Sequence, residues 1–401
     1  MTYAHMAKTR THSTGPAREK AILVGVNVRS EGDYWALDDS LAELSELARA
    51  AGANPLSRVT QMLNKPSRTY LGKGKIDELQ QMVHHTDVDV VIFDDELTPS
   101  QQKSLEDKLK VKVIDRTALI IDVFAQRARS REGRLQIELA QTEYLLPRLA
   151  GQWSHLERLG GGVGTRGPGE TQIETDRRLV RRKLSRVKKE IARVASQRNQ
   201  QRLHRTGGDV KIVSLVGYTN AGKSALFNTM TSSGVIERNQ LFSTLDTTTR
   251  RLYLPSGTAA TLSDTVGFVH KLPPILVASF RATLEEALEA DLLIQVVDIS
   301  SPYAMEQAQV VSDQLEDMGI EDTPRILVLN KLDLVAQSAD EPLALSFLDQ
   351  IEISQFPRII TTSATKGWGL ADLRNAIEAE VGVVADDEEI NGVDLITGND
   401  V

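Results

Sequence analysis

The chain has no cysteine, few aromatic residues and no long apolar segment. Aromatic residues make up 4% of its 401 positions. Without thiols, neither a disulfide nor a thiolate metal site can form, which suits a reducing compartment. No run approaches the roughly 20 apolar residues that a helix needs to cross a bilayer, and no apolar segment follows the basic residues of the first twenty positions. We therefore expect a soluble cytoplasmic protein, with peripheral attachment to a membrane left open.

The chain also lacks an overall excess of positive charge, since its formal net charge is −8. An acidic balance argues weakly against nucleic acid as a partner. The average hides a basic segment, because residues 171–205 contain twelve Lys or Arg residues and three acidic ones. At the other extreme, residues 383–401 carry six acidic residues and no basic one. We predict an acidic disordered tail there.

Three regions with different patterns follow a flexible basic tail at 1–20. Strands alternate with helices over 21–128, which predicts a small α/β domain. Residues 129–208 are mostly helical on both sides of a glycine-rich stretch, which predicts a long helical hairpin with a kink or a break at Pro147. A further region of α/β character over 209–382 predicts a second domain.

Two helix starts carry capping signals. Thr98, Pro99 and Gln101 suit the cap, the first helical position and the residue that reaches back to the cap. Thr171 and Glu174 form the pattern T-x-x-E, so we expect the second helix of the hairpin to begin there.

The second domain begins with a pattern that binds phosphate. The sequence GYTNAGKS follows the apolar run 212–216 and matches G-x-x-x-x-G-K-[ST]. Glycines let the backbone wrap an anion, while Lys223 would reach the β- and γ-phosphates and Ser224 would bind Mg²⁺. The residues predicted to surround the phosphates are Gly217, Tyr218, Thr219, Asn220, Ala221, Gly222, Lys223 and Ser224.

A second motif selects the base. Asp333 can accept two hydrogen bonds from guanine, whereas adenine would leave the carboxylate unpaired. This excludes an ATPase and predicts GTP and GDP as ligands. The residues predicted to hold the base are Asn330, Lys331, Leu332 and Asp333, with Ser363, Ala364 and Thr365 closing the pocket.

Two further segments are typical of nucleotide-dependent switches. In the pattern D-x-x-G, Asp264 would hold Mg²⁺ through water and the Gly267 amide would sense the γ-phosphate. A threonine-rich loop would supply a second Mg²⁺ ligand, for which we choose Thr244 over Thr248. The predicted contacts are Phe242, Ser243, Thr244, Leu245 and Asp246, and Asp264, Thr265, Val266 and Gly267. Together the motifs predict a mostly parallel P-loop GTPase domain in which Lys223, Thr244 and Gly267 serve catalysis.

The residue after Gly267 is Phe268, at a position where Ras-like enzymes use a glutamine to orient water. We therefore expect slow hydrolysis until a partner, another loop or an ion supplies the missing group. Asn220 could ligate a potassium ion, as in potassium-dependent GTPases, or could be an ordinary turn residue; both readings stay open.

The glycine-rich stretch and the basic helix after it suggest contact with RNA. Exposed glycines let backbone approach folded RNA, and arginine can stack on a base or bridge phosphates. A flexible linker and a solvated helix face are the alternatives. The predicted RNA contacts are Gly162, Gly164, Arg166, Gly167, Arg177 and Arg178.

One stretch is specific to a family. Residues 160–178 read GGGVGTRGPGETQIETDRR, residues 70–75 read YLGKGK, and the switch segments read LFSTLDTTTR and DTVGFV. From about residue 21 to 382 the chain resembles the HflX family of ribosome-associated GTPases. The resemblance implies binding to the large ribosomal subunit near the peptidyl-transferase centre, and we expect the chain to be a monomer. There it would use GTP to split or rescue stalled ribosomes under stress such as heat. It also implies Thr244 as the switch threonine.

The chain departs from some members of the family, which carry a further small domain after the GTPase domain. Two other functions stay open. One is a regulatory GTP switch that binds a protein through the hairpin. The other is an RNA-modifying enzyme, for which the N-terminal half offers no evident nucleophile or cofactor site.

Overall fold

The structure is a computed structural model that describes residues 18–28, 35–65, 69–152, 168–205, 210–231, 242, 247–279, 288–339 and 356–382. The chain forms two compact units. The first unit comprises residues 1–200, 238–246 and 269–282, and the second comprises 201–237, 247–268 and 283–401. Two short segments from within the predicted GTPase domain therefore belong to the first unit.

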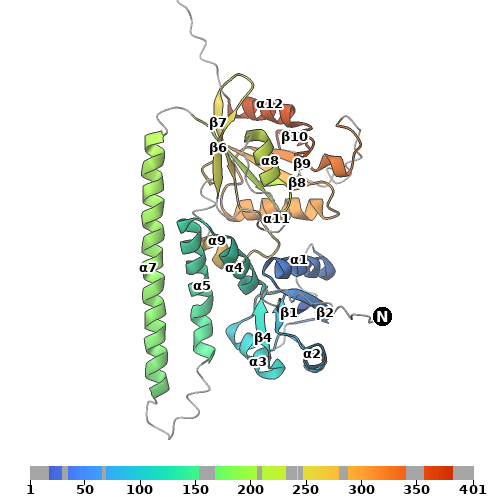
Figure 1. Cartoon of the computed structure of the whole chain (residues 1–401), viewed down its shortest axis with the longest axis vertical. Coiled ribbons are helices and arrows are strands. Elements are labelled where there is room, and N and C mark those ends of the chain that lie inside the picture. Colours follow the sequence, from blue (N-terminus) through green and yellow to red (C-terminus); the bar gives the residue numbers. More distant parts are fainter. Residues whose placement is uncertain are drawn as a thin grey trace, which may run out of the picture. The chain divides into compact units, whose positions relative to one another are not determined.

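The first unit contains a four-stranded parallel sheet with the strand order β2-β1-β3-β4 (Figure 1). Its strands are β1 (Lys20–Val28), β2 (Asn54–Leu63), β3 (Val90–Phe93) and β4 (Lys112–Asp115). Its first helices are α1 (Leu37–Ala50), α2 (Lys73–Thr86), α3 (Pro99–Leu109) and α4 (Arg116–Arg127). The order of strands and helices confirms the α/β prediction, and β3 is buried along its whole length because helices cover both faces of a parallel sheet.

Local sequence signals account for most of these elements. The capping box at the start of α3 is confirmed, since the Thr98 hydroxyl accepts from the Gln101 amide and the Gln101 side chain accepts from the Thr98 amide. Strand β2 was missed. It contains Pro55 and lies at the edge of the sheet, where five of its ten residues are exposed and one is buried, so it has neither the apolar run nor the composition of a buried strand.

A helical hairpin completes the main body of the first unit. Helices α5 (Arg131–Gln152) and α7 (Pro168–Arg205) lie side by side in Figure 1. Leu135 and Leu139 of α5 pack against Val187 of α7. Ion pairs flank this contact, with Lys183 Nζ 3.0 Å from Glu138 and Lys188 Nζ 2.8 Å from Glu143.

One prediction about the hairpin is excluded in part and another is wrong. Helix α5 continues through Pro147, which excludes the break, because a proline removes only one hydrogen bond and packing holds the remaining turns. The kink at Pro147 stays a prediction. Helix α7 begins at Pro168 rather than Thr171. Proline suits the first position of a helix, where its missing N–H costs nothing.

The second unit contains a six-stranded sheet with the order β10-β9-β8-β5-β7-β6. Only the β6–β7 pair is antiparallel among these strands. The strands are β5 (Ile212–Gly217), β6 (Thr248–Tyr253), β7 (Ala259–Asp264), β8 (Leu292–Asp298), β9 (Arg325–Asn330) and β10 (Arg358–Thr361). The helices are α8 (Lys223–Thr231), α11 (Ala304–Asp317) and α12 (Leu370–Val381), and η1 (Leu332–Leu334) is a short 3-10 turn.

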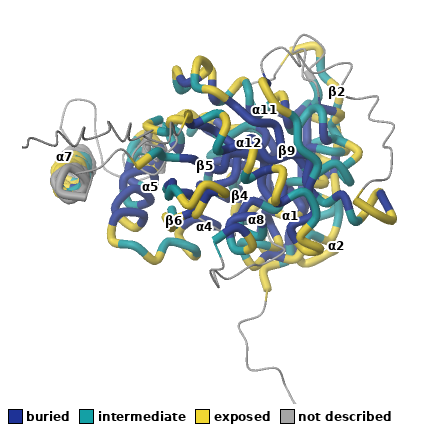
Figure 2. Tube along the Cα trace, turned by 90° about the horizontal axis from the view of Figure 1, so that it is seen from above, coloured by how far each residue is buried: buried dark blue, intermediate teal, exposed yellow. Residues whose placement is uncertain are grey.

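The central strands of this sheet are buried, as Figure 2 shows for β5 and β9. Val213, Leu215, Ile294 and Val328 belong to one apolar core with α8 and α12. The parallel strands β5, β7 and β9 all end at the same edge, where ligands bind in open α/β sheets. Thr248, the second choice for the Mg²⁺ ligand, lies at the start of β6. None of the described helices is both long and apolar enough to cross a bilayer.

Candidate nucleotide-binding site

The loop between β5 and α8 needs glycine at both ends. Gly217 has φ +149°, and a Cβ there would lie 2.4 Å from the Val296 carbonyl oxygen. Gly222 has φ +96°, and a Cβ there would lie 2.2 Å from the Asn330 amide nitrogen. Both positions combine a backbone conformation that favours glycine with a close neighbour. The loop is thus packed against β8 and the base motif, with the start of α8 beside it.

Lys223 lies buried beneath this loop. Its Nζ donates to the carbonyl oxygens of Gly217 at 3.0 Å and Tyr218 at 2.8 Å. Burial lowers the pKa of Lys223 to about 8, although the carboxylate of Asp264 opposes the shift. A phosphate at the loop would stabilise the charged ammonium, so this lysine is suited to bind an anion.

Ser224 and Asp264 bring two hard oxygen donors together. The Ser224 hydroxyl donates to Asp264 Oδ2 at 2.7 Å, and Asp264 is fully buried at the end of β7. Such a pair fits Mg²⁺, which proteins bind through few side chains together with phosphate oxygens and water. Within the described residues, no group of three or more His, Cys, Asp or Glu side chains forms a metal cage made of protein alone.

The backbone of Gly267 and Phe268 lies against the phosphate loop. The Phe268 amide donates to the Gly217 carbonyl at 3.1 Å, and the Thr219 amide donates to the Phe268 carbonyl at 2.8 Å. A Cβ on Gly267 would lie 2.9 Å from Thr219 Cα and 3.0 Å from Lys223 Nζ. Gly267 is therefore beside the lysine that would hold the γ-phosphate. Phe268 is 2% exposed, and its side chain has no hydrogen-bonding group to offer water.

Asn330 joins the base motif to the phosphate loop. Its Nδ2 donates to the Ala221 carbonyl at 2.9 Å. Its Oδ1 accepts from the Thr362 hydroxyl and from the Ala364 amide, both at 3.2 Å. One buried side chain thus ties the base motif to the phosphate loop and to the segment 362–364.

Asp333 is held in an ionised, fixed position. The Ser363 hydroxyl donates to one oxygen at 2.5 Å, and the Thr365 hydroxyl donates to the other at 3.1 Å. Partial burial would raise the pKa of Asp333, but these hydrogen bonds outweigh it and keep the pKa below its ordinary value. Each carboxylate oxygen has two lone pairs, so the group can still accept hydrogen bonds from a base. Beside it, Lys331 Nζ lies 2.7 Å from Asp298.

Comparison with known proteins shows which family the chain is similar to. Residues 38–125 match the family described as GTP-binding GTPase N-terminal, and residues 127–205 match its middle region. Residues 212–331 match the family described as 50S ribosome-binding GTPase. The GTPase HflX of Alkalihalophilus pseudofirmus is 49% identical over 316 residues, which cover 79% of this chain and 74% of that protein. The GTPase HflX of Escherichia coli K12 is 42% identical over 362 residues, covering 90% and 82%.

The chain belongs to the HflX family of GTPases. It is accordingly a P-loop GTPase that binds GTP and GDP and hydrolyses GTP. A crystal structure of a GTP-binding protein from Sulfolobus solfataricus with GDP is 22% identical to it, with a TM-score of 0.44 and coverage of 90% of this chain and 98% of that one. A likeness at that level has no bearing on the site.

Of the five predicted contacts in the first switch of this HflX-family chain, the structure describes one, Phe242. Phe242 is 2% exposed and packs edge-on against Phe124 of α4, with ring centroids 4.4 Å apart, in the first unit. The other predicted switch contacts, Ser243, Thr244, Leu245 and Asp246, lie outside the described residues. Their roles stay predictions.

The predicted RNA contacts are described in part. Arg177 is half-buried and Arg178 is exposed, both on α7. The four at the tip, Gly162, Gly164, Arg166 and Gly167, lie outside the described residues.

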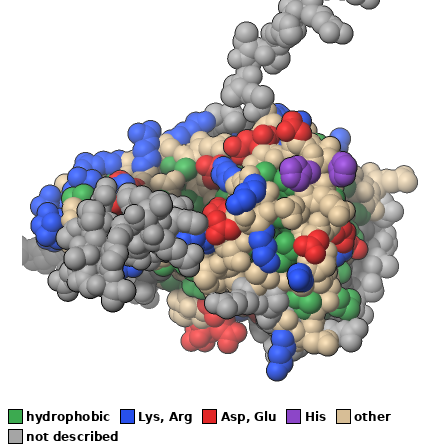
Figure 3. Space-filling view, turned by 90° about the horizontal axis from the view of Figure 1, so that it is seen from below, with side chains coloured by type: hydrophobic (Ala, Val, Ile, Leu, Met, Phe, Trp, Pro, Cys, Tyr) green, Lys and Arg blue, Asp and Glu red, His purple; other side chains and the backbone are tan. Residues whose placement is uncertain are grey.

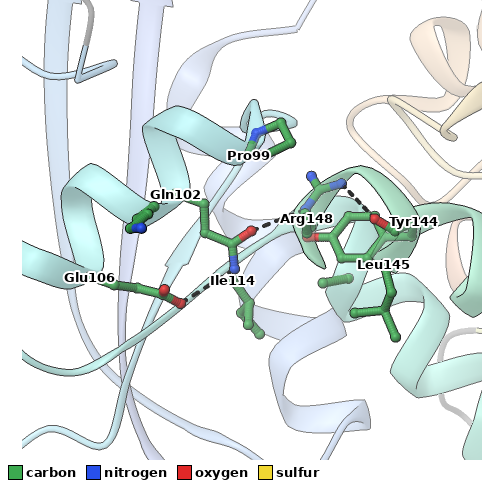
Figure 4. A pocket seen from close by; sticks show the side chains of 9 residues that line it. Pro99, Gln102, Glu106, Ile114, Tyr144, Leu145 and Arg148 are labelled. Atoms are coloured by element: carbon green, nitrogen blue, oxygen red, sulfur yellow. Dashed lines mark hydrogen bonds between the residues drawn. The ribbon is translucent and has the colours of Figure 1, made fainter. Parts of the chain in front are cut away.

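A pocket of about 220 Å³ lies in the first unit, and none of the residues predicted to bind the nucleotide lines it (Figure 4). Arg148 of α5 lines this pocket. The charge of Arg148 is already paired, since Nη2 lies 3.0 Å from Asp115 and the guanidinium stacks 3.4 Å above the Tyr144 ring. Gln102 of α3 accepts a further hydrogen bond from Arg148 at 3.0 Å. The polar groups of this pocket bind one another, so the pocket offers no evident site for a nucleotide.

Sequence reasoning missed the residues that reach the site from elsewhere. Asp298 and Thr362 carry no motif, yet they contact Lys331 and Asn330 because they follow or end neighbouring strands. The position of Asp298 at the end of β8 was the available signal, since the ends of parallel strands meet at one edge.

Proposed function

We propose that this GTPase binds the large ribosomal subunit and uses GTP to split or rescue stalled ribosomes under stress. The match of residues 212–331 to a family described as 50S ribosome-binding supports the partner. The observation that carries the proposal is a stripe of positive charge on α7. Membership of the HflX family supports the same role, which would be exercised in the cytoplasm.

The cationic stripe consists of Arg178, Arg182, Arg186, Lys189 and Arg193. Their spacing of four, four, three and four residues places them on one side of a helix, over about 22 Å of its axis. All five are exposed. Figure 3 shows Lys and Arg side chains gathered over the hairpin.

The stripe faces away from α5. Val187 packs against Leu135 and Leu139 of α5, and at 100° per residue the stripe centres on the opposite side of the helix. Within the described part of the chain, none of the five cations has a carboxylate within 4.0 Å. By contrast, Lys183 and Lys188 on the flank are paired with acids of α5. A row of unneutralised cations is suited to the phosphates of RNA.

Mg²⁺ would be held by Ser224 and Thr244, with Asp264 acting through water. Asn220 is exposed with φ +63° at the turn of the loop, where it could ligate a potassium ion that assists hydrolysis in place of the glutamine that Phe268 replaces. Equal rates of GTP hydrolysis in potassium and sodium salts would contradict a role for potassium. We also propose that the ribosome stimulates hydrolysis, because Phe268 cannot orient water.

The test measures affinity for purified large subunits at several salt concentrations. Substituting Arg182 and Lys189 by alanine should weaken binding and flatten the slope of log K against log salt by about 0.7–0.9 per lost phosphate contact. The matched control substitutes Lys183 and Lys188, which are paired within the hairpin, and should change the slope less. A salt-independent affinity, or equal effects of the two pairs, would instead favour a protein partner.

A further inference from the structure

The segment that follows the second switch motif belongs to the first unit. Gly267 and Phe268 are in the second unit, and the chain enters the first unit at Val269. Val269 is fully buried and His270 is 7% exposed, and the ring of His270 stacks on Trp35 at 4.9 Å. Helix α9 (Pro274–Ser279) follows in the same unit. The residues just after the phosphate-sensing glycine are therefore fixed within the first unit.

Lys271 anchors this segment by charge. Its Nζ lies 3.0 Å from Asp94 Oδ2 and 2.6 Å from Asp95 Oδ1, just after β3. Its φ of +53° is in the left-handed region, which is unfavourable for a residue other than glycine. The ion pairs hold the backbone in this conformation.

Arg116 holds the residue before Lys271, His270, by a hydrogen bond to the backbone carbonyl of His270. Its Nη1 donates to the His270 carbonyl at 3.0 Å and lies 2.7 Å from Glu43, while its Nη2 lies 2.7 Å from Asp94. Arg116 is 2% exposed and Asp94 is fully buried. Burial would raise the pKa of Asp94, but Arg116 and Lys271 hold it well below its ordinary value, so the cluster stays ionised.

We propose that Lys271 is a positioning residue for GTP hydrolysis, which holds the chain after Gly267 so that the Gly267 amide meets the γ-phosphate. Lys271 is four positions after Gly267, a reach of at most about 14 Å. A shift of the anchor is therefore passed to the glycine by covalent connection. By reciprocity, a partner that moves the anchor would alter the affinity for GTP, and GTP would alter the affinity for that partner. The inference depends on the GTPase activity of the family and not on the ribosome.

Hydrolysis and nucleotide affinity of the isolated protein test this role. Lys271→Met should slow single-turnover GTP hydrolysis by about tenfold or more. It should also lower the affinity for a GTP analogue, while the affinity for GDP stays within about twofold. GDP is unaffected because it has no γ-phosphate for Gly267 to contact. Lys271→Arg keeps the charge and should retain most of the rate. Lys112→Met removes an exposed first-unit lysine that pairs with Glu19 and should change nothing.

A second variant separates positioning from folding. Asp95→Asn removes one partner of Lys271 and should slow hydrolysis less than Lys271→Met does. The double variant should be no slower than Lys271→Met alone, because the two residues act through one contact. Melting temperatures are measured in parallel. The proposal is overturned if Lys271→Met leaves the rate of hydrolysis unchanged or lowers the affinities for GDP and the GTP analogue equally. It is also overturned if the losses in rate caused by Lys271→Met and Asp95→Asn add in full in the double variant.

Discussion

Asn330 donates its side-chain amide to the Ala221 carbonyl at 2.9 Å, and so ties the base motif to the phosphate loop. The same side chain accepts from the Ala364 amide in the loop that closes the base pocket. The geometry of the two halves of the nucleotide site therefore depends on one buried residue, which is 1% exposed.

Substitution of Asn330 should lower the affinities for GTP and GDP to a similar extent. Asn330→Ala removes three hydrogen bonds and leaves buried partners unsatisfied, at a cost of about 1–3 kcal/mol or roughly 5- to 150-fold in affinity. GTP and GDP should be affected alike, since the contact is not at the γ-phosphate. Fluorescence titration with both nucleotides measures this. Gln309→Ala, an exposed residue of α11, serves as the control. A selective loss of GTP would contradict the bracing role.

Asp333 should decide which base binds. Asp333→Asn replaces an acceptor by a donor where guanine presents its exocyclic amine. The variant should bind GDP at least about tenfold more weakly and should prefer xanthosine diphosphate, whose oxygen accepts a hydrogen bond. Titration with the guanine, xanthine and adenine diphosphates tests this. An unchanged order of affinities would show that another residue reads the base.

Binding of GDP should take up a proton above about pH 8. Burial lowers the pKa of Lys223 to about 8, against 10.5 for an ordinary lysine. Because the folded pKa is the lower one, this group makes the nucleotide-free protein more stable as pH rises from about 8 to 10.5, and has no such effect below. Phosphates stabilise the charged lysine, so GDP affinity should fall as pH rises above about 8.

Calorimetry in two buffers of different ionisation enthalpy measures the proton uptake. Lys223→Arg stays charged throughout this range and should abolish the uptake. Equal uptake in the variant would assign the proton to another group.

Gly267→Ala should separate binding from hydrolysis. Its methyl group would lie 2.9 Å from Thr219 Cα, which is backbone and cannot move cheaply, and 3.0 Å from Lys223 Nζ. We expect GDP affinity within about threefold and hydrolysis reduced by about a hundredfold, as for loss of a transition-state contact. Gly74→Ala on α2 has open space around the added methyl and serves as the control. Retained hydrolysis in Gly267→Ala would contradict the role of this glycine.

The contiguous motifs of the site were accessible from the sequence because each lies at the end of a buried strand. The loop at Gly217 follows β5, and Asp264 and Asn330 end β7 and β9. Membership of the HflX family bears out the GTPase fold that they predicted. Local capping chemistry likewise predicted the start of α3 at Thr98.

Contacts between distant residues were not accessible in this way. Lys271 and Asp94 are 177 positions apart, and Arg116 and His270 are 154 apart. No spacing rule connects such residues, since their meeting depends on how the whole unit packs. Strand β2 was not predicted for a different reason, because its residues are alternately exposed and half-buried and form no continuous apolar run. At Pro147 the packing of α5 outweighed the local preference of proline to end a helix.

The central claim, GTP-dependent binding to the large ribosomal subunit, is tested most directly by co-sedimentation with purified subunits. The protein is mixed with large subunits in Mg²⁺ and either a non-hydrolysable GTP analogue or GDP, with small subunits as the control. The account predicts that the protein pellets with large subunits at least about tenfold more strongly in the analogue than in GDP, and not with small subunits. Equal pelleting in both nucleotides, or none with large subunits, would contradict it.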